Sequence, residues 1–204
     1  MSRLFAAVYD PVLRATERAC LQAWRAALLR PLEGEVLEIG AGTGANLPHY
    51  GAGVSRLVLS EPDPHMRRRL SARAAEAQPR AELCDRSVME LPYEDESFDV
   101  VVSTLVLCSV PSLSGALAEA RRVLRPGGQL VFLEHVLDPR PGRARLQRAL
   151  CPVWRRVAGG CRLTRRTEEA IGDAGFELQA ITRESMQKSV APVRYTIRGT
   201  ASRS

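Results

Sequence analysis

One segment, VLEIGAGTGANL at residues 36–47, constrains the fold more than any other part of the chain. Its first four residues have the apolar, partly β-branched character of a buried strand, and Gly40, Gly42 and Gly44 follow at alternate positions. Glycines in this pattern let a strand turn sharply into a helix, and they leave room for a ligand because they carry no Cβ atom. The N-terminus of the following helix adds unpaired N–H groups. The segment therefore predicts a strand–turn–helix unit that approaches a ligand.

Strand-like runs alternate with helical runs along the chain, after an N-terminal helical segment. Such alternation is typical of parallel βαβ crossovers, with helices on both faces of one sheet. A loop, not an evident helix, joins the last two strands, so the last strand is expected to run antiparallel at or near an edge. We therefore predict an α/β fold with a seven-stranded, mostly parallel sheet. The predicted strands are residues 36–40, 56–61, 81–85, 98–107, 129–135, 177–182 and 193–201, and the predicted helices are residues 45–50, 64–77, 113–124 and 167–174.

The length and composition fit one globular domain. A chain of 204 residues with 45% hydrophobic and 25% charged residues can bury a sizeable core. No low-complexity linker divides it, so we expect a single domain over residues 1–204. The sequence RPGG at residues 125–128 predicts a turn before the fifth strand.

Charge and cysteine usage exclude several classes of function. The net charge of +6 comes mostly from arginine, and no nucleic-acid-binding motif accompanies it, so no nucleic-acid partner is expected. The longest apolar run, residues 100–110, is too short to span a bilayer, and the N-terminus lacks the pattern of a secretory signal. The five cysteines form no C-x-x-C pair, and the three histidines show no metal-ligand spacing. We expect a cytoplasmic protein with reduced thiols and no metal.

Acidic residues mark a nucleoside-binding edge of the sheet. In an open α/β sheet, ligands bind beyond the carboxyl ends of the strands. Glu61 follows the second strand at roughly the 20-residue offset from the glycine motif at which a carboxylate meets ribose hydroxyls. The alternative is that Glu61 is a solvated strand end. Met66, shortly after, fits either an adenine face or the core side of a helix.

The spacing E-x-G-x-G-x-G (Glu38–Gly44) differs from the dinucleotide-binding pattern G-x-G-x-x-G, and it resembles the first motif of the class I S-adenosylmethionine-dependent methyltransferases. Three later segments are also similar to that family: DRSVMELPY at 85–93, FDVVVSTLVLCSV at 98–110 and E-x-x-R-V-L-R-P-G-G at 119–128. The resemblance implies a Rossmann-like version of the predicted sheet, with helices on both faces and an antiparallel last strand. It also implies S-adenosyl-L-methionine as the cofactor.

The resemblance also implies which residues contact this cofactor. Glu38 and the glycine turn would hold its sulfonium and amino acid part, with Thr104 and Leu105 beside the methionine portion. The acid that the family carries for the adenine amino group falls on Ser87, which is a departure. The base contact then passes to backbone groups of Val88 and Met89, or to the nearby Asp85. The implied cofactor residues are Glu38, Gly40, Ala41, Gly42, Gly44, Glu61, Pro62, Met66, Ser87, Val88, Met89, Thr104 and Leu105.

Further segments narrow the resemblance. TLVLCSV (104–110), LEHV (133–136), P-x-W (152–154) and GCRLTR (160–165) are together similar to the thiol S-methyltransferase branch of the methyltransferase-like proteins, which methylates alkyl thiols and hydrogen sulfide. This resemblance implies a small-molecule acceptor and S-methylation of a thiol. The alternatives are methylation of a quinone precursor or a phospholipid, and a non-catalytic cofactor-binding protein of the same fold.

Methyl transfer from a sulfonium depends mainly on alignment of the reacting atoms. Many thiols are partly ionised at neutral pH, so a strong base is optional. His135, just past the fifth strand, is the predicted general base, and a merely hydrogen-bonded strand-end histidine is the alternative. Cys108 and Trp154 are expected to line the substrate pocket, and a catalytic thiol is the alternative for Cys108. Tyr9 is expected to close over the cofactor in an N-terminal helical lid, residues 1–33, with ordinary helix packing as the alternative.

Residues 138–166 form a basic amphipathic insertion. Because the segment follows the fifth strand, where insertions of this fold cover the substrate pocket, we expect its apolar stripe to form a lid. A basic amphipathic helix can also lie on a membrane surface, so weak peripheral membrane contact is a second expectation. The stripe is Leu146, Leu150, Val153, Trp154 and Val157, and the basic residues are Arg143, Arg145, Arg148, Arg155 and Arg156.

Overall fold

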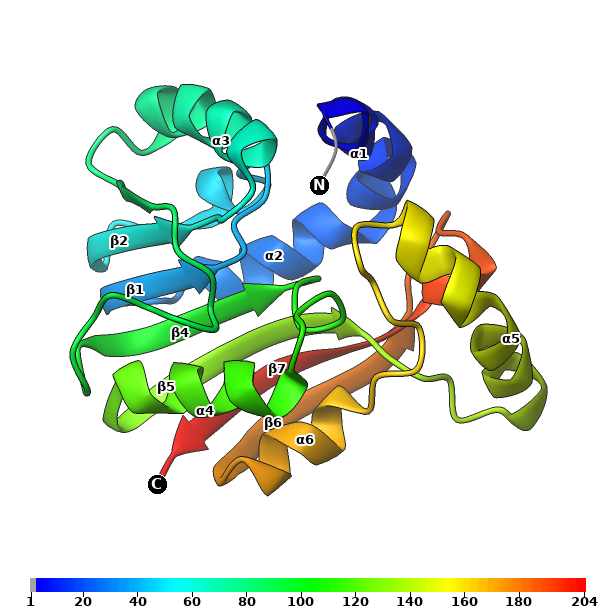
Figure 1. Cartoon of the computed structure of the whole chain (residues 1–204). Coiled ribbons are helices and arrows are strands. Elements are labelled where there is room, and N and C mark those ends of the chain that lie inside the picture. The colour runs from blue at the N-terminus through cyan, green and yellow to red at the C-terminus, as the bar shows by residue number, and fades with distance from the viewer. Residues whose placement is uncertain (1–2) are drawn as a thin grey trace.

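The computed structural model of the protein describes residues 3–204, which form one seven-stranded sheet with helices on both faces (Figure 1). Residues 1 and 2 of the predicted lid lie outside the described residues. The strands are β1 (Gly34–Ile39), β2 (Val54–Ser60), β3 (Glu82–Cys84), β4 (Phe98–Thr104), β5 (Leu124–His135), β6 (Phe176–Ser185) and β7 (Tyr195–Arg203). The α-helices are α1 (Arg3–Thr16), α2 (Gln22–Leu29), α3 (Pro64–Ala77), α4 (Leu113–Val123), α5 (Pro141–Val157) and α6 (Thr167–Asp173).

The strand order is β3-β2-β1-β4-β5-β7-β6. The pairs from β3 to β5 are parallel, whereas β7 runs antiparallel to both β5 and β6. This confirms the predicted Rossmann-like sheet with an antiparallel last strand. β7 lies one position in from the edge, which β6 occupies. The order reverses at β1, so the carboxyl ends of β1 and β4 flank the position where such sheets bind ligands.

The central strands divide their side chains between two cores because successive strand residues point to opposite faces. Leu37 and Phe132 pack on the face covered by α4 and α6. Val36 and Val131 pack on the opposite face, with Leu70 of α3. Both faces of the sheet are therefore buried, and polar residues can converge only at the ends of the strands.

Two local predictions are wrong. The expected helix over residues 45–50 is only a 3-10 turn, Leu47–His49, because the glycine turn extends to Gly44 and the backbone is already extended at Tyr50. The expected turn at 125–128 lies within β5, which already begins at Leu124. Gly127 takes a positive φ of 75°, and the pairing with β4 shifts register there before it continues at Gln129.

The predicted insertion contains α5, but its apolar stripe does not cover a pocket. Leu146, Leu150, Val153 and Val157 are exposed, whereas Trp154 is partly buried. The buried residues of α5 are Ala144 and Gln147 instead, and Gln147 Nε2 donates to the backbone oxygens of Val136 and Pro192 at 3.1 and 2.8 Å. Within residues 3–204, no helix has the length and apolar character needed to cross a membrane.

Candidate active site

The glycine turn after β1 has the open geometry that its sequence predicts. Gly40, Gly42 and Gly44 have φ values of 58°, 58° and 87°, in the left-handed region that favours glycine. A Cβ atom on Gly40 would come within 2.6 Å of the Val106 side chain, so this glycine permits close packing. A Cβ atom on Gly42 would meet only the Gly40 carbonyl oxygen, at 3.9 Å. Gly42 therefore borders open space that a ligand can approach.

Glu61 lies directly against this turn. Its Oε2 accepts a hydrogen bond from the Gly42 N–H, and its Oε1 accepts one from the Asp63 N–H, both at 2.8 Å. Burial raises the pKa of the Glu61 carboxyl, and the two N–H donors oppose that shift. A carboxylate has about four lone-pair positions, so two remain for hydroxyl donors. With an exposed fraction of only 3%, Glu61 is not a solvated strand end.

Glu38 lies in a buried polar network beneath the turn. Its Oε2 accepts from the Tyr50 hydroxyl at 2.7 Å, and its Oε1 accepts from Asn46 Nδ2 at 2.9 Å. Arg25 donates to Asn46 Oδ1 at 2.6 Å. Arg25 and Asn46 both donate to Thr104 Oγ1, at 3.0 and 2.9 Å. The network connects α2, β1, the glycine turn and the end of β4.

This network changes how Glu38 and Thr104 are understood. Both carboxylate oxygens of Glu38 already have protein donors, so direct contact with a sulfonium or amino group stays a prediction. Neither Arg25 nor Asn46 was predicted from sequence to belong to the site. Arg25 is 3% exposed and forms an ion pair with Glu17 at 3.0 Å. The available signal was a single arginine among the apolar residues of α2. An arginine in such a place is buried only when it has partners, so it would have indicated a buried polar network.

Hydrogen bonds within the loop after β3, and one from the end of β2, hold that loop in place. Ser87 Oγ accepts from the Met89 N–H at 3.2 Å, and the Ser60 hydroxyl donates to the Arg86 carbonyl at 2.6 Å. Val88 is buried in the core next to this loop, whereas Asp85 is exposed and pairs with Arg86 at 3.6 Å. The adenine contacts predicted here remain predictions, and so does Met66, which is 1% exposed.

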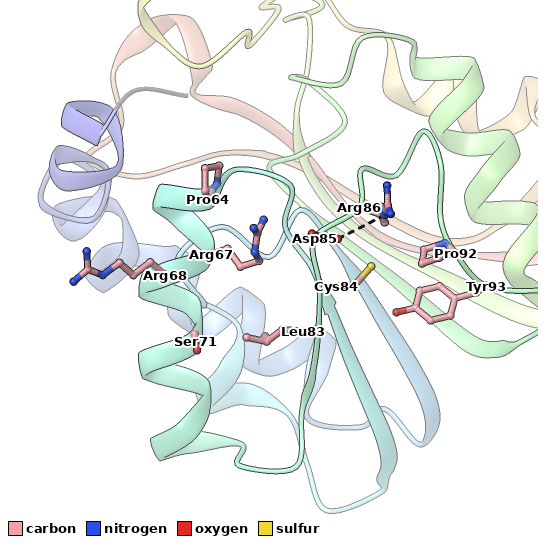
Figure 2. Close-up of a pocket in the computed structure, with 10 residues that line it drawn as sticks. All are labelled: Pro64, Arg67, Arg68, Ser71, Leu83, Cys84, Asp85, Arg86, Pro92 and Tyr93. Atoms are coloured by element: carbon pink, nitrogen blue, oxygen red, sulfur yellow. Dashed lines mark ion pairs between the residues drawn. The ribbon is translucent and has the colours of Figure 1, made fainter.

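A groove beside this loop is a separate surface feature. Figure 2 shows it between α3 and residues 85–93, with Leu83 and Cys84 of β3 in its floor. Asp85, the alternative predicted contact for the adenine base, lines it, whereas the thirteen implied cofactor residues do not. Arg67 connects the groove with the site, since its guanidinium donates to the Glu61 carbonyl at 2.9 Å.

The N-terminal helix α1 reaches over the glycine turn. The Thr43 hydroxyl donates to Asp10 Oδ1 at 2.6 Å, and Arg73 of α3 donates to Asp10 Oδ2 at 2.5 Å. Tyr9 is the neighbouring residue and is partly buried. Desolvation raises the pKa of its hydroxyl, which Arg25 lowers and Cys108 raises further. The structure therefore brings Tyr9 close to both the polar network and Cys108.

A strained turn follows β4. Leu105 has a φ of 59°, which is uncommon for a residue with a side chain and is typical of functional sites. The Glu134 carboxylate holds this turn, since its Oε1 accepts from the backbone N–H groups of Val106 and Leu107 at 3.0 and 3.1 Å. Ser103 Oγ donates to the same oxygen at 2.8 Å. The turn directs the chain toward Cys108.

Three chemically active side chains meet beyond the ends of β4 and β5. The Sγ atoms of Cys108 and Cys161 and a ring nitrogen of His135 all lie within 4.8 Å of one another. His135 Nε2 is 2.9 Å from Cys161 Sγ, and Trp154 Nε1 donates to the same sulfur at 3.3 Å. Hydrogen bonds from Cys108, His135 and Trp154 lower the pKa of Cys161 to about 5 against the effect of its burial. We call Cys108, His135, Cys161 and Trp154 the sulfur cluster.

The sulfur cluster unites three predicted residues with one that was missed. His135, Cys108 and Trp154 were each selected from sequence, whereas Cys161 was not. The pKa of Cys108 lies well above its usual value, because the Cys108 thiol hydrogen-bonds to Cys161 and is buried. His135 is 3% exposed, and its Nδ1 has no hydrogen-bond partner among the described residues.

Comparisons with known proteins identify the family. The family described as "Methyltransferase domain" matches residues 37–132. Thiol S-methyltransferase TMT1B of Homo sapiens is 39% identical over 173 residues, which cover 81% of this chain and 69% of that protein. The chain belongs to the S-adenosylmethionine-dependent methyltransferases. TMT1B of Rattus norvegicus is 41% identical over 156 residues, which cover 69% of this methyltransferase and 59% of the rat protein.

Solved structures support the fold. An S-adenosylmethionine-dependent methyltransferase from Thermotoga maritima has a TM-score of 0.73 at 20% identity and covers 99% of this chain and 97% of its own. The [4+2]-cyclase SpnF has a TM-score of 0.74 at 18% identity and covers 98% and 94%. Because a protein named a cyclase shares the fold, the reaction of this methyltransferase must be argued from its site.

The buried carboxyl of Glu38 predicts a pH-dependent stability. Burial raises its pKa from 4.5 to about 7, so the folded state holds the proton more tightly than the unfolded state. The free energy of unfolding should therefore fall by about 3 kcal/mol as the pH rises from 4.5 to about 7. Glu38→Gln, which cannot ionise, should lack this decrease in urea unfolding, whereas the exposed control Glu33→Gln should keep it. An unchanged decrease in Glu38→Gln would contradict the assignment.

Proposed function

We propose that this methyltransferase transfers the methyl group of S-adenosylmethionine to the sulfur of a small thiol. The sulfur cluster carries the proposal, because it sets an imidazole with one nitrogen that has no hydrogen-bond partner among the described residues beside the turn after β4. The names of the human and rat relatives support a thiol acceptor. Methylation of a quinone precursor or a phospholipid, and cofactor binding without catalysis, are the alternatives.

The cofactor would lie across the carboxyl ends of β1, β2 and β4. Glu61 offers two open acceptor positions for the ribose hydroxyls, and Gly42 leaves the space through which the ligand passes. Thr104 and Leu105 would flank the methionine portion, with Arg25 and Asn46 behind them. The remaining predicted contacts, from Gly40, Ala41, Pro62, Met66, Ser87, Val88 and Met89, complete this part of the proposal.

The protein's contribution to the reaction is alignment and proton acceptance. The bound cofactor supplies an already activated methyl group. A thiol that enters beside Cys108 would lose its proton to His135, and its sulfur would then attack the methyl carbon in line with the leaving sulfur. Alignment of this kind can contribute roughly 7–11 kcal/mol. α1 would act as a lid, since Asp10 already connects it to the glycine turn and α3.

The test of function is a labelled-methyl assay with an alkyl thiol, hydrosulfide, a quinol precursor and phosphatidylethanolamine. We expect labelled thioether from the alkyl thiol and none from the quinol or the lipid. Label on the quinol or the lipid alone would establish an alternative acceptor. Cofactor binding without any labelled product would establish the non-catalytic alternative.

Glu61 provides a direct test of the cofactor site. Glu61→Gln replaces one anionic acceptor oxygen by an NH2 donor that faces the Gly42 or Asp63 N–H. Because hydrogen bonds to charged groups contribute about 1.5–3 kcal/mol, we expect about 10- to 100-fold weaker S-adenosylmethionine binding by calorimetry. Glu76→Gln, on an exposed carboxylate of α3, is the control and should bind like the unmodified protein. Equal affinities for both variants would contradict the ribose assignment.

We also propose weak peripheral contact of α5 with anionic membranes, a cytoplasmic location and no nucleic-acid partner. The exposed apolar stripe lies on a helix with exposed arginines at 145, 148, 155 and 156, which fits an interfacial helix. The described cysteines are free thiols, which fits a reducing compartment.

Liposomes test the membrane contact. We expect partial cosedimentation with anionic vesicles at low salt, lost at high salt and in the double variant Val153→Asp, Val157→Asp. The exposed Val190 lies outside α5, so Val190→Asp should still cosediment. No cosedimentation of the unmodified protein at low salt would remove this part of the proposal.

A further inference from the structure

The sulfur of Cys161 has an unusual environment for a buried thiol. It is 2.9 Å from His135 Nε2, and it accepts from Trp154 Nε1 at 3.3 Å. The Cys108 thiol lies close enough to hydrogen-bond to it as well. Cys161 itself is only 7% exposed. Trp154 donates to this buried sulfur, and His135 donates to it as well when its proton is on Nε2. Donors around a buried acceptor stabilise an anion, because each hydrogen bond favours the charged form.

Two sulfurs and an imidazole also have the composition of a zinc site, but the geometry disagrees. A tetrahedral zinc ion, with bonds of about 2.3 Å to sulfur and 2.0 Å to nitrogen, holds these two atoms about 3.5 Å apart. His135 and Cys161 are in hydrogen-bond contact at 2.9 Å. Metal-bound histidines also almost always donate their second N–H to a carboxylate, a carbonyl or water. Among residues 3–204, nothing accepts from His135 Nδ1.

We propose that Cys161 is a thiolate that positions His135 as the proton acceptor for the substrate thiol. The inference rests on the proposed thiol methylation, and it assigns Cys161 as the residue that positions the general base of that reaction. With Nε2–H donated to the Cys161 sulfur, the neutral ring carries its lone pair on Nδ1, the nitrogen without a protein partner. The carboxylate of a Ser-His-Asp triad has the same role of fixing the tautomer and stabilising the imidazolium.

The proton transfer balances without any further reactant. The substrate S–H bond breaks as an N–H bond forms at Nδ1, which leaves a substrate thiolate and an imidazolium. The thiolate forms its new bond to the methyl carbon as the bond between that carbon and the sulfonium sulfur breaks. His135 then releases its proton to solvent. The adjacent Cys161 anion stabilises the imidazolium that this step forms.

Other ionisable groups surround this pair. Cys108 faces it from the turn after β4, Glu134 precedes His135 in β5, and Arg165 acts electrostatically on Cys108 from the loop before α6. Tyr9 of α1 approaches Cys108 from the side of the lid. Cys108 and Tyr9 keep their protons, because burial raises both pKa values. Cys161 is thus the thiol of this group whose pKa its neighbours lower.

The experiment compares Cys161→Ser with Cys161→Asp. Serine cannot ionise, whereas aspartate is an anion of similar size that can accept the Nε2–H. With an alkyl thiol at neutral pH, Cys161→Ser should lose about 100-fold in kcat, the typical contribution of a general base. That loss should shrink as the pH rises past the pKa of the substrate thiol, because the substrate then arrives ionised. Cys161→Asp should recover much of the activity at neutral pH.

Two further measurements separate this role from a structural one. Cys151 packs in the same apolar cluster with its sulfur 4.0 Å from the Thr164 hydroxyl, so Cys151→Ser is the control and should keep the pH profile. Thiolate absorbance in the ultraviolet, which requires no turnover, should show one ionised cysteine at neutral pH that Cys161→Ser lacks. The absorbance measurement tests the thiolate of Cys161 even if the protein methylates no thiol. In that case the proposed function is contradicted, but the charge of Cys161 is still decided.

Several results would overturn the proposal. The first is the absence of a thiolate at neutral pH in the unmodified protein. The second is a loss of kcat in Cys161→Ser that is the same at every pH and is equally large in Cys161→Asp. Stoichiometric zinc in the purified protein that Cys161→Ser does not retain would also overturn it, because His135 would then be a ligand.

Discussion

The buried contacts among Glu38, Asn46, Arg25 and Thr104 are the constraint on which the rest of the site depends. They fasten the N-terminal helices to the carboxyl ends of β1 and β4, and they lie directly beneath the glycine turn. A buried charge is costly unless it is paired, and here the charges of Arg25 and Glu38 are connected through Asn46. The glycine turn therefore has a fixed floor, and Gly42 can stay open above it.

Local patterns were sufficient to predict the sheet and the turn. Strands such as residues 98–104 are apolar on both faces because helices cover both, and glycines at alternate positions allow few alternatives to a sharp turn. The position of Glu61 beside the glycine turn was also predictable, since its distance from the glycines follows from the length of the segment between β1 and the end of β2. The prediction of a helix over residues 45–50 was wrong, because the turn geometry continues past Gly44 and Pro48 follows.

Contacts between distant segments could not be predicted in this way. Cys161 meets His135 only because the insertion folds back after α5, and no spacing rule applies to an insertion of that length. The face that α5 presents was misjudged for the same reason. Its stripe satisfied a helical period, but Gln147 decided the orientation by donating to backbone carbonyls of two separate segments. A buried polar residue can outweigh an apolar stripe, since an unmet hydrogen bond costs about 1–3 kcal/mol.

The proposed site has two halves, one for the cofactor and one for the methyl acceptor, and different parts of the chain form them. The proposed cofactor half is built on strand ends and on the glycine turn, and the fold that carries them is shared with a protein named a cyclase. The sulfur cluster instead takes Cys161 and Trp154 from the insertion and joins them to His135 at the end of β5. The strained Leu105, held through Glu134, connects these halves, because the turn after β4 passes from Thr104 to Cys108. Acceptor chemistry can therefore change with the insertion while cofactor binding stays the same.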